Sequence, residues 1–415
     1  MSDHPVEGGG DDFLTKMLGD LLRLMPSGSG FQWPLAYQLA ASAAAGDEPD
    51  PNPDPRERIR LEELSGVAAM HVADVTGMQP SPSGQAPRLV PTSRSEWAHR
   101  TLDSWRPVLD RLSAGHGGAA GAASGGGGDV GGAGGSGGPG DISPEQLAEQ
   151  GLDPKVAGLL NRWAGAVMPM MIAMQVGSAV GHLAQRALGH YDVPVAPAKG
   201  DEILAVSSNM AAVAEDWSLR PDDLALWLCT HEIVLHAVLS RPHVAARLAD
   251  LIVAHAEHVR PDPGALQQLM TGADPGDVSS MMDLFSDPAA LQSSVDSDEV
   301  RQVRAQLDAL TATIAGYAEH VTATIATRLI GPHASINEAM RRRRVGRGAG
   351  ERVAEELFGL RLDQENVDRG ARFVAGVLER SGDTELARLF VAEATLPTPA
   401  EVDAPGLWLA RLEIV

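Results

Sequence analysis

The sequence predicts a mainly α-helical protein with a multi-helix domain and at most minor β structure. Apolar residues recur three to four positions apart over long stretches, as in Leu61–Val75, which is the spacing of an amphipathic helix. Stretches rich in Pro, Gly and Asp, such as residues 46–56, separate these segments and cannot continue a helix. Only Ile203–Val206 reads as a short strand. Aromatic residues make up 4% of the chain, so the core depends on Ala, Leu, Val and Met.

The first 112 residues are predicted to form an N-terminal helical segment that packs on the main domain. Four helical stretches are expected there: Phe13–Met25, Trp33–Ala45, Leu61–Val75 and Thr92–Leu109. Residues 113–141 follow as a run of Gly, Ser and Ala with too little apolar content to pack, and we expect a disordered linker. A glycine-rich phosphate loop would need a preceding strand and a spaced glycine pattern that leads directly into a helix, and neither the strand nor the spacing is present.

Residues 142–415 are predicted to form the main helical domain. It begins with a capping signature, in which Ser143 is the N-cap, Pro144 occupies the first helical position and Gln146 completes a capping box. Further helices are expected at about residues 143–189, from 221 onward, and at 298–330, 334–345, 349–358, 364–381 and 384–393. A Pro/Gly/Asp/Ser stretch interrupts the pattern near 261–300, and three prolines make the tail from 396 to 408 read as a loop.

Charge and cysteine content exclude several classes of function. The chain carries 33 basic and 55 acidic residues, a formal net charge of −22, so a broad nucleic-acid-binding surface is excluded. One cysteine excludes a disulfide framework and a cysteine-rich zinc site.

No leader pattern is visible, and we expect a cytoplasmic protein. Residues 163–185 carry no Asp, Glu, Lys or Arg, but their polar and small residues favour a buried helix over stable membrane insertion. The oligomeric state is not predicted.

The segment His231-Glu232-Ile233-Val234-Leu235-His236 is the strongest candidate for chemistry. It lies in a predicted helix that starts near Pro221 and ends before Pro242. In helical zinc peptidases two histidines four residues apart face one metal, and the Glu after the first is the general base. Here the spacing is five, which separates the rings by roughly 140° around a regular helix. A π-bulge would bring them together.

A structural role explains the same residues. Leu224, Leu228, His231, Leu235 and Val238 form one helical stripe. In that interpretation His231 is a core histidine bonded to a backbone acceptor, and Glu232 and His236 form an i, i+4 pair. Cys229 then reads as an inert buried thiol.

The run Arg341–Arg344 is a local basic cluster in an acidic chain. It fits the end of a helix, where the guanidinium groups pair with nearby carboxylates and complement the helix dipole. A site for an anionic partner is the alternative. Spacing alone leaves both open.

Several segments together resemble a known family. They are Gln175–Ala184, Leu188–Pro194, Asn209–Trp217, Trp227–Pro242, Gly316–Val321, Arg341–Arg344, Gly370–Val374 and Leu396–Pro399. The chain, over most of its length outside the glycine-rich run, resembles the zincin-like hydrolases, an all-helical bacterial family of metallopeptidase-like proteins. This resemblance implies zinc as cofactor and a peptide or protein as substrate.

The family pattern also implies roles for individual residues. It has His-Glu-x-x-His on the central helix and a Glu before the Gly of a later helix. Carried over, His231 is a metal ligand and Glu232 the general base, whereas the second His position falls on Leu235 and the later Glu on Ala315.

Two residues could compensate for these departures. His236 lies one residue after the second ligand position, and Glu319 lies one helical turn after Ala315. Two functions follow as expectations: a zinc-dependent metallopeptidase-like hydrolase with a degenerate motif, built from His231, His236 and Glu319 with Glu232 as base, or a catalytically inactive zincin-fold protein with a binding or structural role.

Overall fold

The computed structural model describes residues 31–46, 50–121, 170, 172–258, 297–346 and 348–414. Several predictions fall elsewhere. The expected helix at 13–25, the capping signature at 143–146 and most of the 261–300 interruption lie outside the described residues, as do positions 122–141 of the expected linker. Within the described ranges the chain is overwhelmingly helical, with one pair of strands, as the sequence predicts.

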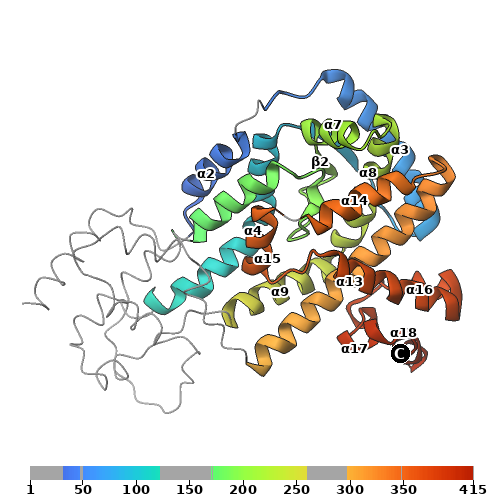
Figure 1. The fold of residues 1–415 in the computed structure, drawn as a ribbon. Coiled ribbons are helices and arrows are strands. Elements are labelled where there is room, and N and C mark those ends of the chain that lie inside the picture. Colours follow the sequence, from blue (N-terminus) through green and yellow to red (C-terminus); the bar gives the residue numbers. More distant parts are fainter. Residues whose placement is uncertain are drawn as a thin grey trace, which may run out of the picture. The chain divides into compact units, whose positions relative to one another are not determined.

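By compactness the chain divides into two units. One comprises residues 1–38 and 109–177, and the other comprises residues 39–108 and 178–415. The second contains every residue of the candidate site. Its main helices are α3 (Pro55–Thr76), α7 (Ser207–Asp216), α8 (Pro221–Leu239), α9 (Pro242–His258), α13 (Asp298–Leu329), α14 (Ala334–Val345), α15 (Ala349–Phe358) and α16 (Gln364–Leu386). Figure 1 labels most of the helices and the strand β2 (Glu202–Val206) along the chain.

Helix α3 shows how local sequence sets an element's ends. Asp54 is the N-cap, and its carboxylate accepts a hydrogen bond from the Arg56 N–H at 2.8 Å. Pro55 follows at the first helical position, where its missing N–H costs nothing. Gly77 ends the helix with φ 65°, a left-handed conformation that glycine adopts without a steric penalty. The helix predicted at Leu61–Val75 is therefore confirmed and extends further at its start.

Two short strands form a parallel pair. The predicted strand at 203–206 is confirmed as β2 (Glu202–Val206), and its partner is β1 (Arg88–Thr92), with Leu89 opposite Ile203. The sequence reading missed β1, because five residues that include Pro91 give a weak strand pattern. A proline is tolerated there because each strand of a two-stranded sheet is an edge strand.

Helix α8 is the centre of the larger unit and contacts α3, α13 and α9. Nearly all of its side chains are buried, including polar ones, so it is apolar on every face. Helix α13 begins at the N-cap Ser297 and crosses α16 at two glycines. A Cβ on Gly316 would lie 2.1 Å from the carbonyl carbon of Gly370, so only glycine permits this backbone contact.

The C-terminal region corrects two predictions. No separate helix spans 384–393; α16 instead continues to Leu386 through a break at Gly382 (φ 72°). The tail expected to be a loop contains α17 (Pro399–Asp403) and α18 (Pro405–Ile414). Each begins with a proline, so these prolines start helices at the position where the lost N–H has no intrahelical partner.

The remaining predictions concern the first part of the chain. Helix α2 (Trp33–Ala45) has the predicted bounds. Helix α4 (Arg94–Gly121) is longer than expected and overlaps the first residues of the predicted linker. The limits of the predicted domains stay predictions.

The uncharged stretch 163–185 is described only in part, as a helix at Ile172–Ala184. Among the described residues, no single helix is both long and apolar enough to cross a membrane. The helix pair α8 and α9, bent by 84°, passes that test by length and composition.

Candidate functional site

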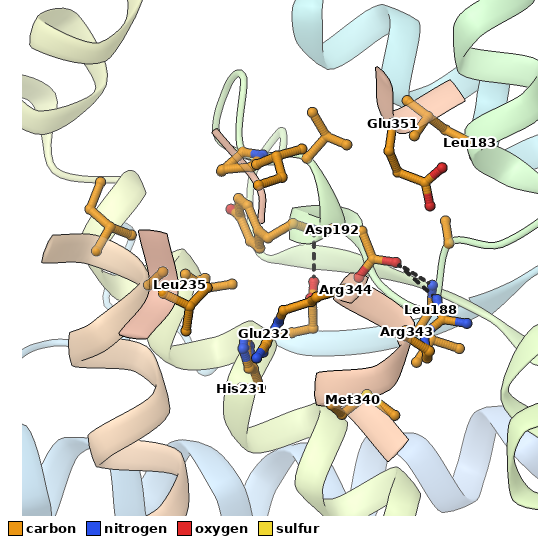
Figure 2. Close-up of a pocket in the computed structure, with 18 of the residues that line it drawn as sticks. Leu183, Leu188, Asp192, His231, Glu232, Leu235, Met340, Arg343, Arg344 and Glu351 are labelled. Carbon is orange, nitrogen blue, oxygen red and sulfur yellow. Dashed lines mark hydrogen bonds and ion pairs between the residues drawn. The ribbon is translucent and has the colours of Figure 1, made fainter. Parts of the chain in front are cut away.

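A cavity of about 170 Å³ lies beside α8 in the larger unit (Figure 2). Its walls come from α8, α13, α14 and the turn η1 (His190–Asp192). The polar side chains that line it include Tyr191, Asp192, His231, Glu232, Thr311, Arg186, Arg343, Arg344, Glu351 and Arg361. Leu235 and Ala315, the residues on which the sequence resemblance places the second histidine and the later glutamate, line the same cavity. His231 and Glu232 of the sequence-predicted motif therefore face a hollow large enough for about six water molecules.

His231 is the predicted ligand that borders this cavity. Its side chain is half-buried, and its ring lies 4.9 Å from the ring of Trp227. The structure gives it no hydrogen bond within the described ranges, so the expected backbone acceptor is not found. Burial lowers its pKa to about 4, against the opposing effect of Glu319. His231 is therefore neutral at pH 7, with one ring nitrogen free to accept a hydrogen bond.

Glu232, the predicted base, is held by the backbone of η1. Its side chain is 1% exposed, and its carboxyl Oε2 accepts a hydrogen bond from the Tyr191 N–H at 3.0 Å. Gly189 approaches so closely that a Cβ there would lie 2.2 Å from the Glu232 carboxyl carbon. Burial and the nearby Asp192 raise the pKa of Glu232 well above its usual value. This shift favours the protonated form of Glu232, which is not the form that a general base needs.

His236 is bound to Tyr191 and is not among the cavity-lining residues. It is 1% exposed, and its Nδ1 lies 2.7 Å from the Tyr191 hydroxyl. The Ser240 hydroxyl lies 3.2 Å from the same nitrogen, and burial lowers the pKa of His236 to about 4. The expected ion pair between His236 and Glu232 is not found in the described part of the chain. Both residues contact Tyr191 instead.

Tyr191 is the residue that sequence reasoning missed. Its backbone N–H binds Glu232, and its hydroxyl contacts His236 and accepts a hydrogen bond from the Ala198 N–H at 3.0 Å. It is separated from Glu232 by 41 positions, and no local spacing links the two. The segment Leu188–Pro194 was noted only as part of the family resemblance.

Glu319 forms an ion pair with Arg344, whose Nη1 also donates to the Gln364 side chain at 3.3 Å. It is not among the residues that line the cavity. Within the described ranges, no group of three or more His, Cys, Asp or Glu side chains converges closely enough to hold a metal ion. The donor set around His231 therefore does not fit zinc, which takes three or four converging protein ligands.

The arginine run divides between surface and cavity. Arg341 pairs with Asp368, and Arg342 pairs with Glu338 and lies 5.6 Å from the Trp217 ring centre. Arg343 and Arg344 line the cavity. Arg343 Nη2 donates to the Arg186 carbonyl oxygen at 2.5 Å and lies 3.8 Å from the Asp192 carboxylate. The predicted pairing with carboxylates is thus present in all four.

Comparisons with known proteins agree with the sequence resemblance. No curated protein matches the chain. A crystal structure described as "a putative hydrolase with a novel fold", from Chloroflexus aurantiacus, has the same fold, with a TM-score of 0.59 and 20% sequence identity over 92% of this chain and 99% of that one. Residues 31–409 match a family described as zincin-like metallopeptidase. Because that match spans nearly the whole sequence, the chain belongs to the zincin-like metallopeptidase family.

Proposed function

We propose that this protein uses the cavity beside α8 to bind a ligand and does not carry out zinc-dependent hydrolysis. One observation supports this proposal most directly. Leu235 and Ala315, at the positions where the family pattern has a histidine and a glutamate, line the same cavity as His231 and Glu232. The cavity of the fold is kept, while two of the three side chains that would hold a metal are apolar.

The contacts of the remaining candidates support the same proposal. For His236 to reach a metal beside His231, it would leave the Tyr191 hydroxyl and cross roughly 140° of helix. For Glu232 to act as base, it would leave the Tyr191 N–H and lose its proton in a buried setting. Each change leaves a buried polar group without a partner, at about 1–3 kcal/mol.

Metal analysis tests the proposal directly. The full-length protein, produced with zinc present and then purified by gel filtration, is expected to carry less than about a tenth of an equivalent of zinc. A stoichiometric zinc content that His231→Ala removes would refute the proposal.

Restoring the family pattern supplies a positive control. The variant Leu235→His with Ala315→Glu places two ligands beside His231, and we expect it to gain zinc. The matched control, Leu235→Phe with Ala315→Gln, has similar bulk without the ligands and should bind none. If neither variant binds zinc, the loss of two ligands does not explain the low zinc content expected of the natural protein.

A zinc-dependent hydrolase acting on peptide bonds is the second candidate function. Its ligands would be His231, His236 and Glu319, with Glu232 as base. The observation that favours it is the electrostatic effect of Glu319 on His231, which raises the histidine's pKa and indicates that the two groups are close. This candidate requires that Glu319→Gln abolish both zinc content and peptidase activity. Our proposal predicts that the natural protein has neither bound zinc nor peptidase activity, so Glu319→Gln should change neither.

A further inference from the structure

We infer that the cavity beside α8 recognises the free carboxylate of a peptide's apolar C-terminal residue, and that Arg343 binds this carboxylate. The inference rests on the proposed function, in which the cavity is a binding site in a protein of peptidase ancestry. It follows from the charges around the cavity, the free donors of one guanidinium group, and the apolar side chains that line the same cavity.

Arginine side chains gather around the cavity in an otherwise acidic protein. Four guanidinium groups line it, from Arg186, Arg343, Arg344 and Arg361, against three carboxyl groups. In a chain with a net charge of −22, this concentration of positive charge favours an anionic ligand.

Arg343 has the free donors that an anion needs. Its hydrogen bond in the described structure goes from Nη2 to the Arg186 carbonyl oxygen, and Asp192 lies at the long distance of 3.8 Å. A guanidinium group has five N–H donors in a planar fork that matches a carboxylate. Burial lowers the pKa of Arg343, so a bound anion would offset the cost of its desolvation.

The other three guanidinium groups are already matched by carboxylates. Arg186 Nε lies 3.1 Å from Glu351, and Arg361 lies 3.1 Å from Asp363. Arg344 pairs with Glu319. A ligand carboxylate would have to displace a closely bound protein carboxylate at each of these positions, whereas at Arg343 the protein carboxylate, Asp192, lies at the longer distance of 3.8 Å.

The rest of the cavity suits an apolar side chain and a peptide group. Its apolar wall includes Leu183, Leu228, Leu235, Leu248, Ile314 and Met340. His231 borders the same space without a hydrogen bond in the described structure, so its ring can pair with a ligand amide. A carboxylate at Arg343 with a branched apolar group against the wall is the arrangement of a peptide's last residue.

Calorimetric titration with two small probes tests the inference. N-acetyl-L-leucine has the carboxylate, and N-acetyl-L-leucinamide replaces it with a neutral amide of the same shape. At pH 7 we expect the acid to bind at least tenfold more tightly than the amide. If the ligand is a peptide, N-acetyl-Ala-Ala-Leu should bind at least as tightly as N-acetyl-L-leucine. Weaker binding of the tripeptide would indicate a free acyl amino acid as the ligand and would overturn the assignment to a peptide. Equal binding of acid and amide would overturn the whole inference.

Variants locate the carboxylate. Arg343→Gln should weaken acid binding at least fivefold and leave amide binding unchanged, whereas the neighbouring Arg342→Gln should change neither, because Arg342 contacts Trp217 and Glu338. No effect of Arg343→Gln would overturn the assignment. Should Arg343→Gln fail to fold, Asp192→Asn provides the second test: removing the competing charge should tighten acid binding about threefold, and unchanged or weaker binding would count against Arg343.

The zinc content of the same sample separates this inference from the proposed function. Acid binding that depends on Arg343 and survives a chelator upholds the inference even if zinc is found, in which case only the proposed function fails. A zinc-free protein that does not distinguish acid from amide refutes the inference and leaves the proposed function standing.

Discussion

The close approach of Gly189 to Glu232 makes the fixed position of this carboxyl group measurable. In Gly189→Ala the new Cβ would lie 2.2–2.6 Å from the Glu232 carboxyl atoms, so Glu232 must move. If the η1 turn holds it, moving it leaves the buried Tyr191 N–H without its acceptor, and the free energy of unfolding should fall by about 1–3 kcal/mol. If Glu232 swings freely into the cavity, the substitution should cost little.

Gly66 supplies a matched control. It lies in the exposed middle of α3, where an added Cβ has no heavy atom within 4 Å. Gly66→Ala should therefore raise the free energy of unfolding by about 0.5–1 kcal/mol, because alanine favours the helix. The two glycine substitutions should differ by about 1.5–4 kcal/mol in opposite directions.

Urea unfolding followed by circular dichroism measures both variants. A double-mutant cycle with Glu232→Ala identifies the cause, because the alanine at 189 should cost less than about 0.5 kcal/mol once the carboxyl group is gone. A stability of Gly189→Ala within about 0.5 kcal/mol of the natural protein would refute this reasoning. That result would also make Glu232 available to the cavity as a base.

Three further outcomes follow from the buried groups around Tyr191. The folded protein keeps a proton on Glu232 that the unfolded chain releases above its ordinary pKa, so stability should fall as pH rises from 5 to 7, by up to about 1.4 kcal/mol per unit. Glu232→Gln should remove that part of the slope in urea titrations at pH 5, 6 and 7; parallel curves would contradict it. Tyr191→Phe deprives His236 and the Ala198 N–H of a partner and should lower the urea-derived stability by about 1–3 kcal/mol, whereas no change would mean that these contacts contribute nothing. Burial raises the pKa of Cys229 to about 12, so a thiol reagent should modify it only as the protein unfolds in urea, and immediate labelling of the native protein would show an open helix.

Local signals account for most of what the sequence could predict about the fold. Helix α3 has its N-cap, first-position proline and terminal glycine within one stretch of chain, and α13 has its N-cap at Ser297. The elements that were missed lack such a pattern or reverse its usual meaning. Strand β1 is short and contains Pro91, and the prolines at 399 and 405 start helices instead of ending them.

The candidate site was predictable in part, for a similar reason. Helical rotation alone separates His231 from His236, and the structure has the first on the cavity and the second against Tyr191. What binds Glu232 could not be predicted, because Tyr191 reaches it from 41 positions away through its backbone N–H. Every residue has that group, so its use leaves no trace in the sequence.

The glycine contact between α13 and α16 has a consequence for the floor of the cavity. Ala315 lies directly before Gly316, where the two backbones touch and neither helix can move closer or accept a side chain. A substitution at position 315 can change the side chain that lines the cavity, but it does not move the α13 backbone that carries this side chain. This backbone contact therefore holds the wall of the cavity in place whichever side chain stands at position 315.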